Sequence, residues 1–249
     1  MDRRGFNKLV TLALFAFGVG CSGITSSEVL VSAAASLTDA FAEVEAAFET
    51  ANPGVDVVLN LGSSSSLRQQ ILEGAPADVF ASANSSNMDQ VVAGGEAVGE
   101  PTTFALNLLQ IAVPAGNPAG ITGLQDFANE DLLIGLCAED VPCGDFGRQA
   151  LANAGVIAAI DTNEPDVRAL LTKIEAGELD AGITYVTDVR SAGGAVEGIV
   201  IPDDVNVVAA YPIVRLTSAS NPDGAAAFVT FVLSGPGQTI LASYGFTSP

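Results

Sequence analysis

The order of sequence patterns predicts an α/β protein whose sheets are covered by helices on both faces. From Glu28 onward, short apolar runs typical of strands alternate with amphipathic patterns typical of helices. The 249 residues suffice for one large domain or two modest ones with real cores. No linker rich in Pro, Ser or charge divides the chain, and no repeat of fixed period is present. In such folds, ligands bind beyond the carboxyl ends of the strands.

The first elements show the alternation clearly. Residues 28–33 form an apolar, strand-like run. Four apolar residues then fall on one helical face, before Asn-Pro-Gly ends the helix: Leu37, Phe41, Val44 and Phe48. Further strands are expected at 55–61, 78–82, 106–113, 132–136, 181–185, 198–201 and 205–210. Further helices are expected at 67–72, 87–93, 146–154, 167–175, 228–233 and 237–244.

The N-terminus has the features of a secretory signal. Arg3, Arg4 and Lys8 precede an apolar run over residues 9–19, which is too short to span a bilayer. The basic start also resembles the twin-arginine export pattern, although Asp2 stands where Ser or Thr is usual. We therefore expect an exported protein, in the periplasm or on the outer face of the cytoplasmic membrane.

Residues 18–21 resemble a bacterial lipobox, with Gly18 in place of the preferred Leu. Processing there would remove the signal and leave Cys21 as a lipid-modified first residue. The alternative is an ordinary signal that ends in a buried cysteine. No later segment is long and apolar enough for a second span, so the expected contact with the membrane is through the lipid alone.

Composition excludes several classes of function. The chain contains no histidine, so Ser-His-Asp and Cys-His mechanisms and zinc sites built on imidazole are not available. The formal net charge is −20, which argues against nucleic acid or an anionic membrane surface as a partner. A small anion would have to be held by short-range hydrogen bonds.

Two serine segments suggest how this could happen. Residues 29–37 (VLVSAAASL) and 62–67 (GSSSSL) each end in small residues and serine ahead of a helical pattern. The first N–H groups of a helix lack intrahelical partners and carry partial positive charge. Two such helix starts facing one cleft would form an uncharged anion receptor. Alternatively, Ser36, paired with Asp39, and Ser64 could simply be helix caps.

Several segments together carry a resemblance to a known family. They are AAASLTDAF, GSSSSLRQQILEGAPADVFASAN, VPCG, DVRALLTKIEAGELDAGITYVTD and SYGFT. In this order, over residues 29–247, the chain resembles the molybdate-binding proteins of ABC import systems. The resemblance implies the type II periplasmic-binding-protein fold, in which two crossover strands join two α/β lobes around a ligand cleft. Lobe 1 would comprise residues 28–106 plus 216–249, and lobe 2 residues 107–215, with crossovers near 107–113 and 211–215.

The resemblance also implies a binding site. Ser36 and Ser64 would contact the oxyanion from lobe 1, and Ala83 would offer a backbone N–H. Lobe 2 would supply Cys143, where family members often have alanine, the backbone N–H of Val167 and the hydroxyl of Tyr185. By default, Tyr185 would instead be a core aromatic whose hydroxyl is satisfied locally.

The resulting expectation is a monomeric, non-enzymatic receptor that delivers molybdate or tungstate to an ABC permease. It would need no cofactor, and metal would enter only as the metal oxyanion. Alternatives are a receptor for another oxyanion such as sulfate, or a histidine-free hydrolase.

Cys137 and Cys143 bracket AEDVP in a chain expected to be exported, so a disulfide between them is one expectation. A pair of reduced, partly buried thiols is the other.

Overall fold

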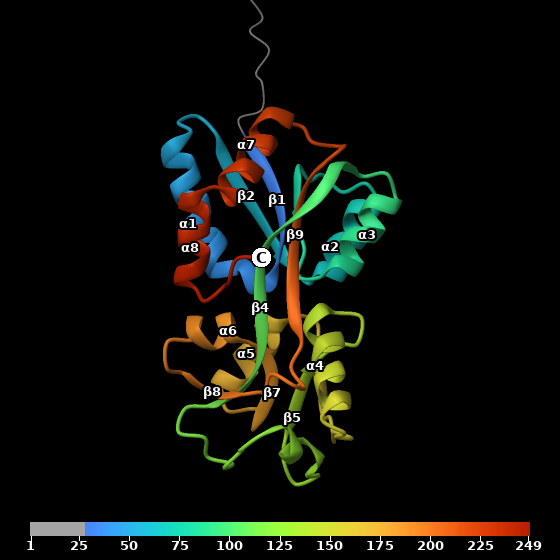
Figure 1. The fold of residues 1–249 in the computed structure, drawn as a ribbon, viewed down its shortest axis with the longest axis vertical. Coiled ribbons are helices and arrows are strands. Elements are labelled where there is room, and N and C mark those ends of the chain that lie inside the picture. Colours follow the sequence, from blue (N-terminus) through green and yellow to red (C-terminus); the bar gives the residue numbers. More distant parts are fainter. Residues whose placement is uncertain (1–27) are drawn as a thin grey trace, which may run out of the picture.

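Two long strands join an upper and a lower lobe, each built on its own part of a sheet (Figure 1). The structure is a computed structural model that describes residues 28–249. The expected signal segment, the twin-arginine pattern and the lipid site at Cys21 lie outside these residues.

The elements divide as follows. The upper lobe contains β1 (Glu28–Ala34), η1 (Ala35–Leu37), α1 (Thr38–Ala51), β2 (Asp56–Gly62), α2 (Ser64–Leu72), β3 (Val79–Ala81), α3 (Ser85–Ala93), α7 (Pro222–Leu233) and α8 (Gly235–Ser243). The lower lobe contains η2 (Leu124–Ala128), β5 (Ile134–Cys137), α4 (Pro142–Asn153), β6 (Thr162–Glu164), α5 (Val167–Glu175), β7 (Ala181–Tyr185), α6 (Val186–Ser191) and β8 (Val196–Val200). The joining strands are β4 (Ala97–Pro114) and β9 (Val208–Leu216).

Strand pairing explains how β4 serves both lobes. In the upper lobe β1 is parallel to β2 and β3, while β9 is antiparallel to β3 and to β4. The pairing of β4 with β9 ends at Leu108, and its antiparallel pairing with β7 begins at Leu109. In the lower lobe β5 is parallel to β6 and β7, and β8 pairs with β4. One strand therefore belongs to both parts of the sheet.

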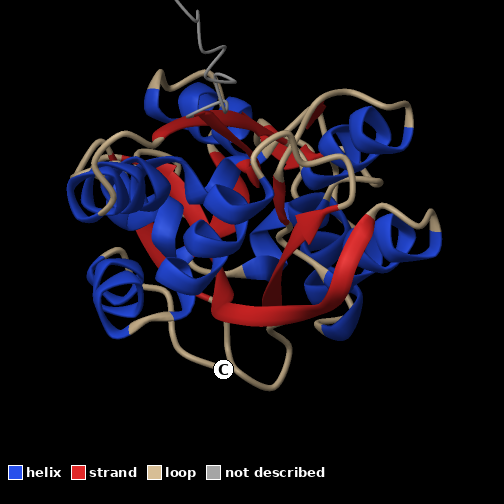
Figure 2. Ribbon diagram, turned by 90° about the horizontal axis from the view of Figure 1, so that it is seen from above, coloured by secondary structure: helices blue, strands red, loops and turns tan. Residues whose placement is uncertain are grey.

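Helices cover both faces of the upper sheet, as the alternating patterns predict. Along β3, Val79 and Ala81 face the main core, whereas Phe80 faces a smaller cluster that includes Leu67 of α2 and Met88 of α3. Figure 2, seen from above, shows helices on both sides of the central strands, with parts of other strands at the outer edge. The predicted α/β class is confirmed.

The opposite face is covered by α1, α7 and α8. The apolar stripe predicted for the first helix is buried there, and Phe41 and Phe48 meet Phe228 of α7 edge to face. The ring centroids are 6.0 and 5.3 Å apart. Within residues 28–249, no single helix is long and apolar enough to span a membrane. Helices α7 and α8 meet that length and composition only when they are taken together, and they are bent by 61° at their junction.

The structure extends several predicted elements. Helix α2 begins at Ser64 and α4 at Pro142, a turn earlier than their apolar patterns predict. Strand β4 begins at Ala97 rather than near 106, since its first half is polar and its pairing with β9 is irregular. Helix α6 and strand β6 were not predicted, because each is too short to show a period.

The first turn of α4 packs closely against the backbone at the end of β5. A Cβ atom on Gly144 would collide with the backbone carbonyl oxygens of Ala138 and Cys137. We expect Gly144→Ala to lower the free energy of unfolding by about 3 kcal/mol, because backbone cannot move aside cheaply. Gly147→Ala, in the same helix, is the control: its nearest neighbour would be Ile183 Cβ at 3.5 Å, an ordinary contact. The control should change stability by no more than about 1 kcal/mol. Equal effects in urea denaturation would contradict this account.

Candidate functional site

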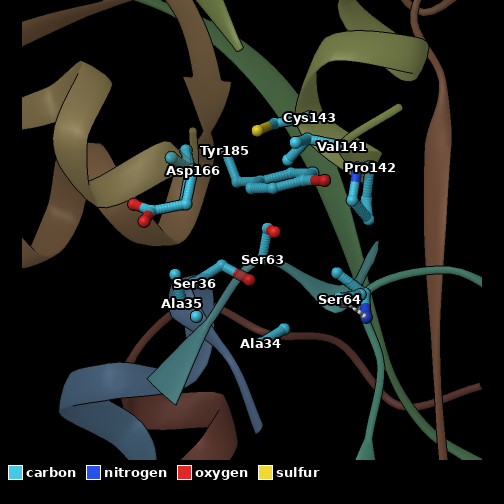
Figure 3. A pocket seen from close by; sticks show the side chains of 13 residues that line it. Ala34, Ala35, Ser36, Ser63, Ser64, Val141, Pro142, Cys143, Asp166 and Tyr185 are labelled. Atoms are coloured by element: carbon cyan, nitrogen blue, oxygen red, sulfur yellow. Dashed lines mark hydrogen bonds between the residues drawn. The ribbon is translucent and has the colours of Figure 1, made fainter. Parts of the chain in front are cut away.

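A small cavity lies between the lobes, and all six residues expected at the site line it. They are Ser36, Ser64, Ala83, Cys143, Val167 and Tyr185. Its volume is about 10 Å³. That is about the space of one water molecule and far too little for a sugar or an amino acid. In Figure 3 the serines lie on one side of the cavity, opposite Cys143 and Tyr185.

Strand ends and helix starts form the walls of this cavity. Strands β1 and β2 end at Ala34 and Gly62, and β7 ends at Tyr185, all three of which line the cavity. The starts of η1, α2, α4 and α5 follow such strand ends or short loops. The cavity is therefore at the carboxyl edge of the parallel strands, where α/β folds bind ligands.

Ser64 is not the cap of α2. The N-cap is Ser63, whose Oγ accepts the N–H of Ser66 at 3.2 Å. Ser64 is the first helical residue, and its Oγ accepts the N–H of Ala83 at 2.9 Å. Ala83 thus lines the cavity while its N–H is directed to Ser64. That bond uses one of the two acceptor lone pairs of the hydroxyl and leaves the Ser64 proton available to donate.

Ser36 is not a cap either. It lies in η1, and the N-cap of α1 is Leu37, which makes no side-chain capping bond. The buried Oγ of Ser36 lies instead 2.9 Å from the phenolic oxygen of Tyr211 on β9. Sequence reasoning missed Tyr211 as a site residue, because only the tertiary structure brings together two residues so distant in sequence.

The start of α4 leaves one N–H for a ligand. Pro142, the first helical residue, has no N–H. The N–H groups of Gly144 and Asp145 both donate to the carbonyl of Val141, at 2.9 Å. Within the described chain, no acceptor takes the N–H of Cys143. The structure also joins Cys143 to Cys137 by a disulfide, which ties the start of α4 to the end of β5.

The start of α5 also leaves one N–H group without an acceptor. The Asp166 carboxylate caps the helix by accepting the N–H groups of Arg168 and Ala169, each at 2.9 Å. None of the hydrogen bonds among residues 28–249 uses the N–H of Val167. Asp166 lines the cavity, but Figure 3 shows its carboxylate oxygens on the side away from the Tyr185 hydroxyl. An Asp before a helical pattern is a capping signal, and it could have been recognised in the sequence.

Tyr185 presents a buried hydroxyl that has no hydrogen-bond partner among the described residues. An unpartnered buried hydroxyl costs free energy, so its place in the cavity wall points to a ligand that completes it. Burial raises the pKa of Tyr185 well above its ordinary value, so the hydroxyl keeps its proton. Its nearest aromatic neighbour is Tyr211, whose ring centroid lies 6.1 Å away.

Neutral donors dominate the site. No Lys or Arg is among the residues that line the cavity, and Asp166 is the one charged side chain there. Serine and tyrosine hydroxyls and the helix starts at Cys143 and Val167 line the space from both lobes. No group of three or more His, Cys, Asp or Glu residues within 28–249 could hold a bare metal ion. The arrangement is suited to a fully ionised anion that needs donors only.

Comparison with known proteins agrees with this chemistry. Residues 29–247 match the family described as bacterial extracellular solute-binding protein. The chain is 38% identical over 221 residues to the molybdate-binding protein ModA of Mycobacterium tuberculosis, an alignment that covers 89% of this chain and 85% of that protein.

Two solved structures share the fold. The periplasmic molybdate-binding protein of Azotobacter vinelandii has a TM-score of 0.78 and 21% identity, over 89% of this chain and 99% of that one. The sulfate-binding protein SubI of Mycobacterium tuberculosis has a TM-score of 0.78 and 17% identity, over 89% and 86%. The expected two-lobed binding-protein fold is confirmed.

Asp188, beside the site, yields a prediction about pH. Burial raises the pKa of this carboxyl to about 7, although the charge of Arg168 and the N–H of Tyr185, at 3.0 Å from Oδ2, lower it. A raised pKa means that the folded chain holds the proton more tightly than the unfolded chain. The stability that Asp188 contributes is therefore present at about pH 4 and is lost as the pH rises to about 7.

We expect Asp188→Asn to have nearly wild-type stability at about pH 4 and to be more stable by a few kcal/mol above about pH 7. Chemical denaturation at several pH values measures this difference. Asp89→Asn, which removes an exposed carboxylate on α3, is the control. A difference between Asp188→Asn and wild type that does not change with pH would contradict the assignment.

Proposed function

The chain belongs to the bacterial extracellular solute-binding protein family, and we propose that it captures molybdate or tungstate outside the cytoplasm and delivers it to an ABC permease. Relatives named as molybdate-binding proteins support this choice of solute. The observation that carries the proposal is the cavity itself, which is surrounded by uncharged donors from both lobes and by no cationic side chain.

Each wall residue has a defined part in this proposal. Ser36 and Ser64 donate their hydroxyl protons, and Tyr185 donates its phenolic proton. Cys143 and Val167 donate backbone N–H groups that helices α4 and α5 leave unused. Ala83 acts through Ser64, to which its N–H is bonded.

The donor set accounts for the class of anion. Molybdate and tungstate are doubly charged tetrahedral ions whose oxygens only accept hydrogen bonds. Phosphate near neutral pH carries a proton that would need an acceptor, and desolvating that O–H beside donors alone is unfavourable. Sulfate has the same charge and shape as molybdate but is smaller, so the fit of the cavity has to separate the two.

Closure of the lobes gives the receptor its two states. We place the lobe division where β4 changes partner, between Leu108 and Leu109, in keeping with lobes of about 28–106 plus 216–249 and 107–215. Asp39 of α1 and Arg168 of α5 form an ion pair from one lobe to the other. Each lobe supplies part of the donor set, so the anion stabilises the closed state over the open one.

The N-terminal sequence patterns support a proposal for how the protein is exported and anchored. We propose a monomer exported through a signal at residues 1–21, with the twin-arginine route as its path, and anchored by lipid on Cys21. Metabolic labelling with a fatty-acid analogue should mark the wild-type protein and not Cys21→Ser. Labelling of both to the same extent would contradict the anchor.

The protein is a binding protein without turnover in this proposal. The absence of histidine removes the common nucleophilic mechanisms, and the cavity has no carboxylate pair aimed into it. A sulfate receptor on the same fold is the second candidate, because a sulfate-binding protein shares this architecture.

Calorimetric titration with molybdate, tungstate, sulfate and phosphate tests the proposal. We expect tight binding of the first two only. Ser36→Ala and Ser64→Ala should each weaken molybdate binding by about tenfold to a hundredfold, because each removes a hydrogen bond to a charged oxygen. Tyr185→Phe should have a milder effect.

Ser66→Ala is the matched control for Ser64→Ala, since Ser66 lies in the same helix with an exposed side chain. It should bind as wild type does. A preference for sulfate would redirect the assignment of the solute. Normal binding by both serine variants, with unchanged stability, would show that the site is elsewhere.

A further inference from the structure

A chain of buried side chains lies behind Ser36 and connects the two lobes. The Ser36 Oγ is 2.9 Å from the Tyr211 hydroxyl, and the Asn107 side-chain nitrogen lies 3.5 Å from that same hydroxyl. The same nitrogen donates to Thr187 Oγ1 at 2.8 Å. The four residues come from η1, β9, β4 and α6, and all are buried. The proposed function leaves Tyr211, Asn107 and Thr187 without a role.

Asn107 sets the direction of the hydrogen bonds among these four side chains. Its side-chain oxygen accepts the N–H of Leu108 at 3.0 Å, so its nitrogen faces Tyr211 and Thr187. An amide nitrogen only donates. Tyr211 can therefore accept from Asn107, which leaves its own proton available to the Ser36 Oγ.

Tyr211 is held in place as a permanent donor. Its ring packs edge to face against Phe104, Tyr185 and Phe246, with centroids 6.3, 6.1 and 5.3 Å apart. Burial raises the pKa of Tyr211 above its ordinary value, so the phenol keeps its proton. A fixed ring and a retained proton allow Tyr211 to donate to Ser36 Oγ, 2.9 Å away.

We propose that Tyr211 is a positioning residue that determines specificity: by donating to Ser36 Oγ, it directs the Ser36 proton into the cavity and excludes oxyanions that carry a proton of their own. The inference rests on the proposed function, because it concerns the same cavity. Ser64 receives the corresponding donation from the N–H of Ala83. Both serines thus present a proton to the anion, where a freely rotating hydroxyl could also present a lone pair.

Tyr211→Phe tests this by removing only the hydroxyl. The Ser36 side chain would then be free to accept as well as donate. We expect molybdate affinity to fall about tenfold, because Ser36 loses its fixed orientation. Affinity for phosphate or arsenate near neutral pH should fall much less or rise, since the O–H of these ions would gain an acceptor. The ratio of molybdate to phosphate affinity should therefore fall about tenfold or more.

The ratio of molybdate to phosphate affinity distinguishes a positioning role of Tyr211 from a general loss of structure in the variant. A merely structural defect would lower both affinities by the same factor. Tyr244→Phe is the matched control, because it removes an exposed hydroxyl that bonds Glu43 at 3.0 Å, and neither residue lines the cavity. It should leave both affinities unchanged.

Asn107→Asp provides a second variant in case Tyr211→Phe fails to fold. A carboxylate at position 107 would accept the Tyr211 proton, so Tyr211 would accept from Ser36 and the cavity would lose the Ser36 donor. The added charge repels either anion, so the change in the ratio again reports the direction of the Ser36 proton.

Titrations of wild type and variants with molybdate, sulfate, phosphate and arsenate give the result. A fall in the ratio for either variant supports the inference. A ratio within about twofold of wild type in a folded variant overturns it and leaves the proposed function standing. If the wild-type protein prefers sulfate, the assignment of molybdate as the solute fails. The ratio of sulfate to phosphate affinity then tests the role of Tyr211. A wild-type protein that binds no oxyanion overturns both.

Discussion

The N–H groups that a helix start leaves without partners are the feature on which the rest of this structure depends. Four such starts, of η1, α2, α4 and α5, meet at one small cavity. In α4, Pro142 has no N–H and the Val141 carbonyl accepts those of Gly144 and Asp145, which leaves the N–H of Cys143. In α5, the Asp166 carboxylate accepts the next two N–H groups and leaves that of Val167. A strongly acidic chain can hold an anion in this way because the donors act at contact distance, where the long-range charge of the protein matters least.

Convergence of these donors requires both lobes at once, so in the proposed function binding and closure would be one event. Strand β4 pairs with β9 in the upper lobe and with β7 in the lower, and the chain from Ser36 through Tyr211 and Asn107 to Thr187 runs beside this junction. The buried contacts proposed to orient Ser36 toward the anion also join the lobes. In that proposal, specificity and lobe closure share a physical basis.

Much of the fold could be predicted from the sequence, and the errors have clear physical causes. Helix starts at Ser64 and Pro142 were placed a turn too late, because a first turn shows little apolar periodicity: its side chains cap, line a cavity or turn the chain. The first half of β4 was missed because its polar residues pair irregularly with β9. The six residues expected at the site do line one cavity, an expectation that came from the ordered resemblance and not from spacing.

By itself, the sequence determined the alternation of strands and helices, the absence of histidine and cationic clusters, and the serines ahead of helices. These are local properties, set by the period of apolar residues and by the chemistry of single side chains. Only the tertiary structure decided that Ser63 caps α2 while Ser64 faces the cavity, and that Tyr211 lies against Ser36 from 175 residues away. Contacts of that kind depend on how β4 and β9 bring the lobes together, and a pattern of neighbouring residues carries no information about the direction of a hydroxyl proton.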